Sequence, residues 1–360
     1  MQEKNNKIAE DDSYEISFEE SPPKDIIAFN ELRSCADLFR MYEDGDLDIS
    51  PAYQREIVWK SADQTRFIDS LIKGLPIPSL CFSFDYVQEK WSVIDGLQRM
   101  ASIIQFLKKD SDWKLSIIDD VNENIRGKSV SEFQTPKTSL YKLWQRVKNT
   151  TIPITVIRCD PSKEDHSNYI FTIFHRLNSG GTKLTNQEIR NCIFAGPLNN
   201  LIKDLDANKS WKKIHKIKAN NRLRSQEMIL RFFAYNDSLP EYKNQGLGKF
   251  LNFYMRKHQN PSLEFINQHR ELFLKTVDLV ILKMPSLLTE RMSNVLLEAI
   301  LFGVSKNIHS LTNASAKNVY TAYCNMKDSV AFSSTQIQEG LANPKKLSER
   351  LGVAQSTFQL

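Results

Sequence analysis

The sequence lacks any uninterrupted apolar run of the roughly 18 to 20 residues that a membrane-spanning helix requires. Even its apolar stretch Val277–Leu288 carries Asp278 and Lys283. Residues 1–15 have no apolar core of the kind that a secretory signal carries, so we expect a cytoplasmic protein with no membrane partner. An internal repeat is also absent, while 41% hydrophobic and 25% charged residues over 360 positions predict a folded chain of about two domains.

Paired cysteines are missing as well. The five cysteines are scattered singly among apolar neighbours, with no C-x-x-C pair for zinc or dithiol chemistry, and we interpret them as small buried side chains. The 48 lysines and arginines exceed the 43 acidic residues by only five. This excess permits an anionic partner without requiring one, so net charge does not decide the function.

The periodicity of the first half predicts an α+β domain over residues 26–185. It follows residues 1–25, a polar segment without an apolar period that we expect to be a mobile arm. Ser34 is placed to cap a helix that ends at Gly45. Ser61, followed three residues later by Gln64, has the pattern of a capping box at the start of a second helix.

Three strands are expected in this domain. Apolar and polar residues alternate over residues 79–86, and residues 91–94 have the pattern of an antiparallel partner. A third strand is predicted at residues 151–159, where Pro153 has no backbone N–H to donate and therefore suggests an edge position. A helix is expected to follow from Ser162.

Strand signals almost vanish after residue 185, so residues 186–360 are expected to form an all-helical domain. Thr185 and Glu188 make a second capping-box pattern at its start. Further helices are expected at about residues 223–236, 249–258, 263–284, 289–308 and 316–327.

The segment V-I-D-G-L-Q-R, residues 93–99, carries the most chemical information. A strand that ends in Asp95-Gly96 at the start of a helix exposes backbone N–H groups, and Arg99 in the first turn can contact phosphate oxygens. Asp95 would lie beside this anion site, where a carboxylate can hold Mg²⁺ or orient a water molecule. The same spacing also fits a structural role, in which Asp95 caps the helix and Arg99 pairs with it.

Two further polar clusters stand out. Tyr53-Gln54-Arg55 lies between two predicted helices, although such a loop also forms where aromatic residues pack and arginine is solvated. Residues 174–182 end a helix with His175, Arg176, Asn178 and two glycines, a pattern that a simple C-cap and turn also explains.

A basic segment follows in the second half. Residues 211–224 contain no acidic residue, and we expect their cations to contact the DNA backbone, unless they form an ordinary solvated helix face. The six candidate cations are Lys212, Lys213, Lys216, Lys218, Arg222 and Arg224.

The blocks YQREIVW (residues 53–59), VIDGLQR (residues 93–99) and FHRLNSGGTKLTNQEIR (residues 174–190) resemble the GmrSD restriction endonuclease N-terminal domain family. They occur in the order of the family and extend over roughly residues 30–235. The resemblance implies a ParB/sulfiredoxin-like fold with a small mixed sheet and a D-G-Q-Q-R motif. It also implies a role in bacterial defence against phage, as in modification-dependent restriction enzymes.

What the resemblance implies for chemistry is the binding, and hydrolysis, of a nucleoside triphosphate with Mg²⁺. Carried over to this sequence, the nucleotide-binding residues are Gln54, Arg55, Gly96, Gln98, Arg99 and Asn178. Asp95 and Arg99 are the expected catalytic residues, and Asp95 is the expected metal ligand. Leu97 departs from the motif, where the family usually has Gln, and this puts hydrolysis in question.

Three functions remain open at this point. The leading one is a nucleotide-binding or nucleotide-hydrolysing defence protein that couples nucleotide to DNA or a partner subunit. The alternatives are a non-hydrolytic DNA-binding or specificity subunit, and a ParB-like metal-dependent nuclease built on Asp95 and Arg55. Besides DNA, a separate nuclease subunit is a candidate partner, because the C-terminal half shows no histidine pattern of an HNH nuclease. A second copy of the chain is a further candidate partner.

Overall fold

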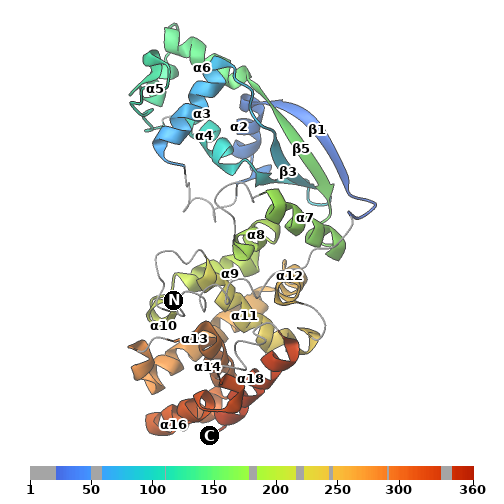
Figure 1. Cartoon of the computed structure of the whole chain (residues 1–360), viewed down its shortest axis with the longest axis vertical. Helices are drawn as coiled ribbons and strands as arrows, with labels where there is room; N and C mark the ends of the chain where they lie inside the picture. The colour runs from blue at the N-terminus through green and yellow to red at the C-terminus, as the bar shows by residue number, and fades with distance from the viewer. Residues whose placement is uncertain are drawn as a thin grey trace. The chain divides into compact units, whose positions relative to one another are not determined.

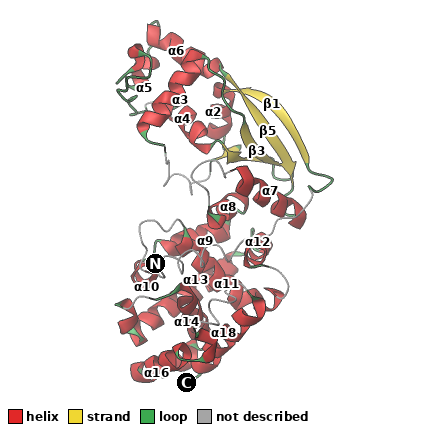
Figure 2. Ribbon diagram, in the orientation of Figure 1, coloured by secondary structure: helices red, strands yellow, loops and turns green. Residues whose placement is uncertain are grey.

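The computed structural model describes residues 22–49, 59–109, 111–177, 185–215, 223–242, 246–289, 292–333 and 343–360. The backbone divides into two compact units, one within residues 20–184 and one that contains residues 185–360 (Figure 1). Strands belong to the first unit, and the described part of the second is helical (Figure 2). No helix in the described ranges combines the length and the apolar character needed to cross a membrane.

A five-stranded mixed sheet forms the base of the first unit, in the order β1-β5-β3-β4-β2. β3 runs parallel to β5 and β2 parallel to β4, whereas β1 pairs with β5, and β3 with β4, in antiparallel register. The strands are β1 (Ile27–Ser34), β2 (Leu47–Asp48), β3 (Leu80–Asp85), β4 (Lys90–Asp95) and β5 (Thr151–Cys159).

Helices of the first unit cover the face of the sheet that carries its core. Phe82, Val93 and Ile154 from the strands pack in one cluster with Leu38 and Ile103 from the helices. This burial of apolar surface is the main source of stability in the unit. Its helices are α2 (Cys35–Glu43), α3 (Ser61–Lys73), α4 (Leu97–Leu107), the 3-10 turn η1 (Glu123–Ile125), α5 (Val130–Phe133), α6 (Ser139–Asn149) and α7 (Glu164–Leu177).

The second unit has a separate hydrophobic core. Trp211, Phe233, Phe273 and Ile300 are fully buried in it, on four different helices. The described helices are α8 (Asn186–Ile193), α9 (Pro197–Asp206), α10 (Lys209–His215), α11 (Arg224–Ser238), η3 (Leu239–Tyr242), α12 (Leu247–Lys257), α13 (Leu263–Lys283), η4 (Pro285–Leu288), α14 (Asn294–Lys306), α15 (Ile308–Asn313), α16 (Ala316–Lys327), η5 (Val330–Phe332) and α18 (Pro344–Thr357).

Helix α8 is held in the second unit by buried polar side chains. Arg190, whose side chain is 2% exposed, donates from Nε to Asn252 Oδ1 at 2.9 Å and pairs with Glu227 at 3.2 Å. Asn191 Nδ2 donates to Gln226 Oε1 at 2.9 Å. Because a buried charge without partners is costly, these contacts fix α8 against α11 and α12.

The predicted fold class is confirmed: an α+β part with a small mixed sheet precedes a helical part. The capping box at the start of α8 is also confirmed, since the side chains of Thr185 and Glu188 each accept a hydrogen bond from the other's backbone N–H. Ser34 caps α2 as expected, and its side chain accepts from Asp37 N.

The predicted capping box at Ser61 is wrong. Lys60 is the N-cap of α3, and Ser61 is the first residue of the helix. The Ser61 hydroxyl instead accepts a hydrogen bond from Trp113 Nε1 at 3.0 Å. A tertiary contact from a distant segment therefore uses the group that the local pattern assigned to the cap.

The edge position predicted for residues 151–159 is also wrong, because β5 lies between β1 and β3. Pro153 is opposite Leu32 of β1, while pairing with β3 begins only at Ile154. A proline is tolerated near the beginning of an internal strand where the second neighbour is not yet paired.

Candidate functional site

The candidate site begins at a single glycine between β4 and α4. Gly96 has φ of 94°, a left-handed conformation that residues with a side chain rarely adopt. A Cβ atom at this position would lie 2.2 Å from Leu80 Cδ2. Glycine is therefore required both by the backbone and by the packing, and the Leu80 side chain fills the space beside it.

Arg99 is held in place by three protein acceptors. Its Nη2 donates to Asp95 Oδ2 at 2.9 Å, and its Nη1 donates to the backbone carbonyls of Pro78 and, at 3.3 Å, Ser79. The Arg99 side chain is only 14% exposed, whereas that of Asp95 is 38% exposed. The guanidinium thus joins the end of β4, the start of α4 and the segment before β3.

Burial lowers the pKa of Arg99 from its ordinary value, and the adjacent Asp95 carboxylate opposes this effect. The guanidinium nevertheless stays charged, because an arginine does not lose its proton in a protein. Its Nε and the second Nη2 hydrogen have no acceptor among the described residues. These donors are the part of Arg99 that a phosphate group can use.

The N-terminal turn of α4 supplies further donors. The first hydrogen bond of the helix runs from Met100 N to Gly96 O at 2.9 Å, so the N–H groups of residues 97–99 precede the hydrogen-bond ladder. They carry the positive end of the helix dipole, which favours an anion. Gln98 borders this turn, and its Oε1 accepts from Trp59 N at 3.3 Å.

Leu97 occupies a packing position. Its side chain is partly buried against the hydrophobic core of the first unit. The leucine at this position, where the resemblance leads us to expect glutamine, therefore packs inside the domain. Its effect on a bound phosphate would be indirect.

Asp95 fits a metal ion only as one ligand among others. One carboxylate oxygen already accepts from Arg99, and Asp95 is not part of the one cluster in the described ranges, Asp25, Asp165 and His166, whose side-chain spacing alone would suit a metal ion. Magnesium at a nucleotide is usually held by one or two carboxylates together with phosphate oxygens and water. Asp95 fits that arrangement, in which Mg²⁺ would supply positive charge to the phosphates.

The group Asp25, Asp165 and His166 is explained by hydrogen bonds. His166 Nδ1 accepts from Asp160 N at 3.0 Å, so Nε2 carries the proton and donates to Asp25 Oδ1 at 2.8 Å. Hydrogen bonds from Lys163 and His166 hold the pKa of Asp25 well below its ordinary value. Neither nitrogen of His166 has a free lone pair for a metal, and the group ties the start of the unit to α7.

Several predicted site residues lie outside the described residues and stay predictions. They are Gln54, Arg55, Asn178, Lys216, Lys218 and Arg222. The structure describes Asp95, Gly96, Gln98 and Arg99 and brings them together at one turn.

The described part of the predicted DNA-binding segment has one exposed side. Lys212 and Lys213 are exposed on α10, between the buried residues Trp211 and Ile214. Arg224, at the start of α11, lies with Nε and Nη2 2.8 and 3.0 Å from the side-chain oxygen of Asn294 in the amide orientation that satisfies both groups. Lys212 and Lys213 are therefore better placed than Arg224 to meet a polyanion.

A family model matches the part of the chain that contains this turn. The model of the GmrSD restriction endonuclease N-terminal domain matches residues 35–195, which include the Gly96 turn and α8. Residues 35–195 carry a GmrSD N-terminal domain. Comparisons with curated proteins and with solved structures gave no match.

A second basic segment, not expected from the sequence, lies inside the GmrSD N-terminal domain. Five lysines and arginines and no acidic residue occur between Phe133 and Cys159. This run was less visible than residues 211–224 because its cations are spaced along α6 and β5. Counting acidic residues over a longer window would have found it.

Proposed function

We propose that the GmrSD N-terminal domain binds the phosphates of a nucleoside triphosphate at the first turn of α4, within a restriction-related protein that acts in defence against phage. The observation that carries the proposal is the placement of Arg99. Its guanidinium is fixed by Asp95 at 2.9 Å beside the N–H groups that open α4. A fixed cation next to a helix N-terminus favours a phosphate through both charge and hydrogen bonding.

Each residue of the turn has a distinct part in this proposal. Arg99 neutralises phosphate charge through its remaining donors, and the N–H groups of residues 97–99 bind phosphate oxygens. Gln98 orients the nucleotide, and Asp95 positions Arg99 and offers one oxygen to Mg²⁺ or water. Gln54, Arg55 and Asn178 complete the site as the family resemblance implies.

The proposal also includes hydrolysis of the bound nucleoside triphosphate. Leu97 packs on the core, so its difference from the family motif leaves the polar side of the turn unchanged. Asp95 and Arg99 remain the proposed catalytic pair, with Asp95 orienting a water molecule and Arg99 stabilising charge on the transferred phosphoryl group. Occupancy of the site would then alter how the chain meets DNA or a partner subunit.

A nucleotide titration tests the proposal. Wild type, Arg99→Ala and Arg99→Lys are titrated with fluorescent ATP and GTP analogues, with Mg²⁺ present. We expect Arg99→Ala to lose tenfold or more in affinity, and Arg99→Lys to recover only part, because lysine keeps the charge but not the planar fork. Arg66→Ala is the control, since Arg66 is an exposed arginine paired with Asp63 and Asp120.

Arg99 also joins three segments, so each variant is first checked by its melting temperature. Equal affinity of wild type and a folded Arg99→Ala would refute the proposed site. Absence of binding by wild type would refute the nucleotide function as a whole.

Binding without turnover is the second candidate, favoured by the ion pair itself. Arg99 occupies one oxygen of Asp95, which leaves the carboxylate less available as a metal ligand or base. Salt-dependent DNA binding with no phosphate release from any nucleotide would support this function over hydrolysis.

A further inference from the structure

Helix α6 presents a basic face to solvent. Ser139, Lys142, Arg146 and Asn149 are all exposed, and their spacing places them on one side of the helix. The opposite side carries Leu140, Leu143 and Trp144, which pack against the hydrophobic core, and the buried Val147. The helix therefore separates an apolar inner face from a cationic outer face.

The cations of α6 are not balanced by acidic partners. Lys142, Arg146 and Lys148 lie on the helix, and Lys137 precedes it. Among the residues that the structure describes, none of these four pairs with a carboxylate. By contrast, two other cations of the same unit, Arg66 and Lys128, both form ion pairs. Unpaired cations gathered on one face attract a polyanion.

Aromatic side chains contact the cation at one edge of the basic face, Lys148. Lys148 Nζ lies 4.5 Å from the ring centre of Trp144, and Tyr141 stacks on the same ring with centroids 5.6 Å apart. Gln145 Nε2 donates to the Tyr141 hydroxyl at 2.8 Å. Two polar side chains, Tyr141 and Gln145, therefore lie with Lys148 on this flank of the helix.

The face is carried by a firmly packed helix. α6 packs against α2, α3 and α5, beside which it lies in Figure 1. Thr138 caps its N-terminus by accepting from Tyr141 N at 3.0 Å. Because Lys142 and Arg146 are four residues apart, their Cα atoms are separated by about 6 Å along the axis. A ligand with repeated negative charge can therefore contact both Lys142 and Arg146 with little loss of conformational entropy in the protein.

We propose that the outer face of α6 binds the phosphate backbone of duplex DNA, with Lys142 and Arg146 as the main contacts and Lys148 at its edge. The face has no element that enters a groove, so the contact is independent of base sequence and positions the DNA. The inference rests on the restriction-related function proposed above, but it does not require nucleotide at the Gly96 turn. It adds a second DNA contact to the one expected at α10.

The test measures the affinity for a 20-base-pair duplex as a function of salt concentration, in the absence of nucleotide. We compare the full-length wild type with Lys142→Ala/Arg146→Ala. The control is Arg66→Ala/Lys128→Ala, which removes the same charge from two ion-paired positions of the same unit. The variant Lys142→Arg/Arg146→Lys keeps both charges on α6.

Each phosphate contact contributes about 0.9 to the slope of log affinity against log salt. We therefore expect Lys142→Ala/Arg146→Ala to lower this slope by about 2 and the affinity tenfold or more at 0.1 M salt. The charge-keeping variant should retain the wild-type slope, and the control should change it less than half as much.

An equal loss in the α6 variant and the control would refute the proposal, since net charge alone would then explain it. A wild type that binds duplex RNA but not DNA through α6 would also refute it. Nucleotide affinity of the α6 variant is measured in parallel and should equal that of wild type. Failure of the nucleotide site and failure of the α6 face are therefore separate results.

Discussion

Asp95 and Arg99 face each other across the Gly96 turn, with Asp95 Oδ2 and Arg99 Nη2 2.9 Å apart. The carboxylate would have two opposite effects on a phosphate bound at this turn. It holds the guanidinium in place, and its own negative charge would repel the phosphate. The balance between these effects is accessible to experiment.

The first prediction concerns Asp95→Asn. Without Mg²⁺, loss of the negative charge should raise nucleotide affinity about fivefold, equivalent to about 1 kcal/mol, because the amide still accepts from Arg99 while the repulsion is gone. With Mg²⁺, any phosphate release should be abolished. Calorimetric titration and a phosphate-release assay measure the two effects. A fall in affinity without Mg²⁺ would show that the carboxylate is needed to position Arg99.

Replacing Gly96 by alanine should destabilise the first unit. The left-handed backbone and the 2.2 Å approach of a Cβ to Leu80 Cδ2 both oppose a side chain. We expect a loss of about 2 to 4 kcal/mol in the free energy of unfolding, measured by urea denaturation. Gly352→Ala is the matched control, because that helical glycine has no atom within 4 Å of a Cβ and alanine favours a helix. A similar outcome for both variants would contradict the packing argument.

The buried ion pair between Arg231 and Glu298 gives a third prediction. Both side chains are 6% exposed. Arg231→Met should cost about 3 to 5 kcal/mol, since it leaves Glu298 buried and charged without its partner. Arg231→Met/Glu298→Leu should recover part of that loss, because Glu227 also pairs with Arg231 and keeps Arg190 as a partner. Thermal denaturation of the single and double variants measures these losses of stability. If the loss in the double variant equals the sum of the losses in the two single variants, the pairing is contradicted.

Acid should weaken the second unit through Asp237. Burial favours the protonated carboxyl, but hydrogen bonds from His269 and Tyr254 outweigh it and hold the pKa of Asp237 below its ordinary 3.8. A depressed pKa contributes stability that is present above pH 3.8 and is lost as pH falls through the lower folded value. The advantage of wild type over Asp237→Asn in free energy of unfolding should therefore shrink below pH 3.8. An advantage that does not change with pH would contradict this.

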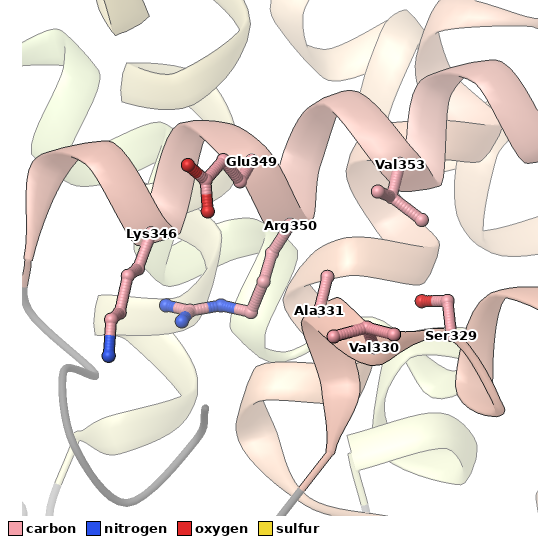
Figure 3. Close-up of a pocket in the computed structure, with 7 residues that line it drawn as sticks. All are labelled: Ser329, Val330, Ala331, Lys346, Glu349, Arg350 and Val353. Atoms are coloured by element: carbon pink, nitrogen blue, oxygen red, sulfur yellow. The ribbon is translucent and has the colours of Figure 1, made fainter. Parts of the chain in front are cut away.

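The α10 contact can be tested beside that of α6. Lys212→Ala/Lys213→Ala removes two exposed cations and should lower the salt slope of DNA binding by about 2, if each contacts one phosphate. Lys345→Ala/Lys346→Ala, at the first turn of α18 in the same unit, serves as the charge-matched control. Lys346 also lines a cavity of about 370 Å³ with Glu349, Arg350 and Val353 (Figure 3). If the two variants have equal salt slopes of DNA binding, the lysines of α10 make no specific contact with DNA.

Local chemistry was the most predictable part of the structure. The capping box of Thr185 and Glu188 depends on residues three positions apart, and the pairing of Asp95 with Arg99 follows from their spacing of four. Both were visible in the sequence because the partners are only three or four residues apart at the start of a helix.

The errors came from contacts between distant segments. The hydroxyl of Ser61 accepts a hydrogen bond from Trp113, which lies far away in the sequence. Pairing with β1 and β3 also makes β5 an internal strand of the sheet. β1 was missed because the burial pattern of Ile27–Ser34 does not alternate, so it gives no period-two signal. Likewise, nothing near Arg99 in the sequence indicates that the carbonyls of Pro78 and Ser79 hold it.

The anchoring of α8 has a consequence for where the GmrSD N-terminal domain can be cut. The family match ends at residue 195, yet two acceptors of Arg190, the side chains of Glu227 and Asn252, lie beyond that limit. A fragment that stops at residue 195 would lack Glu227 and Asn252, so the charged side chain of Arg190 would lose both of these partners. Transplanting this domain onto a foreign C-terminal half would therefore require new acceptors for one arginine.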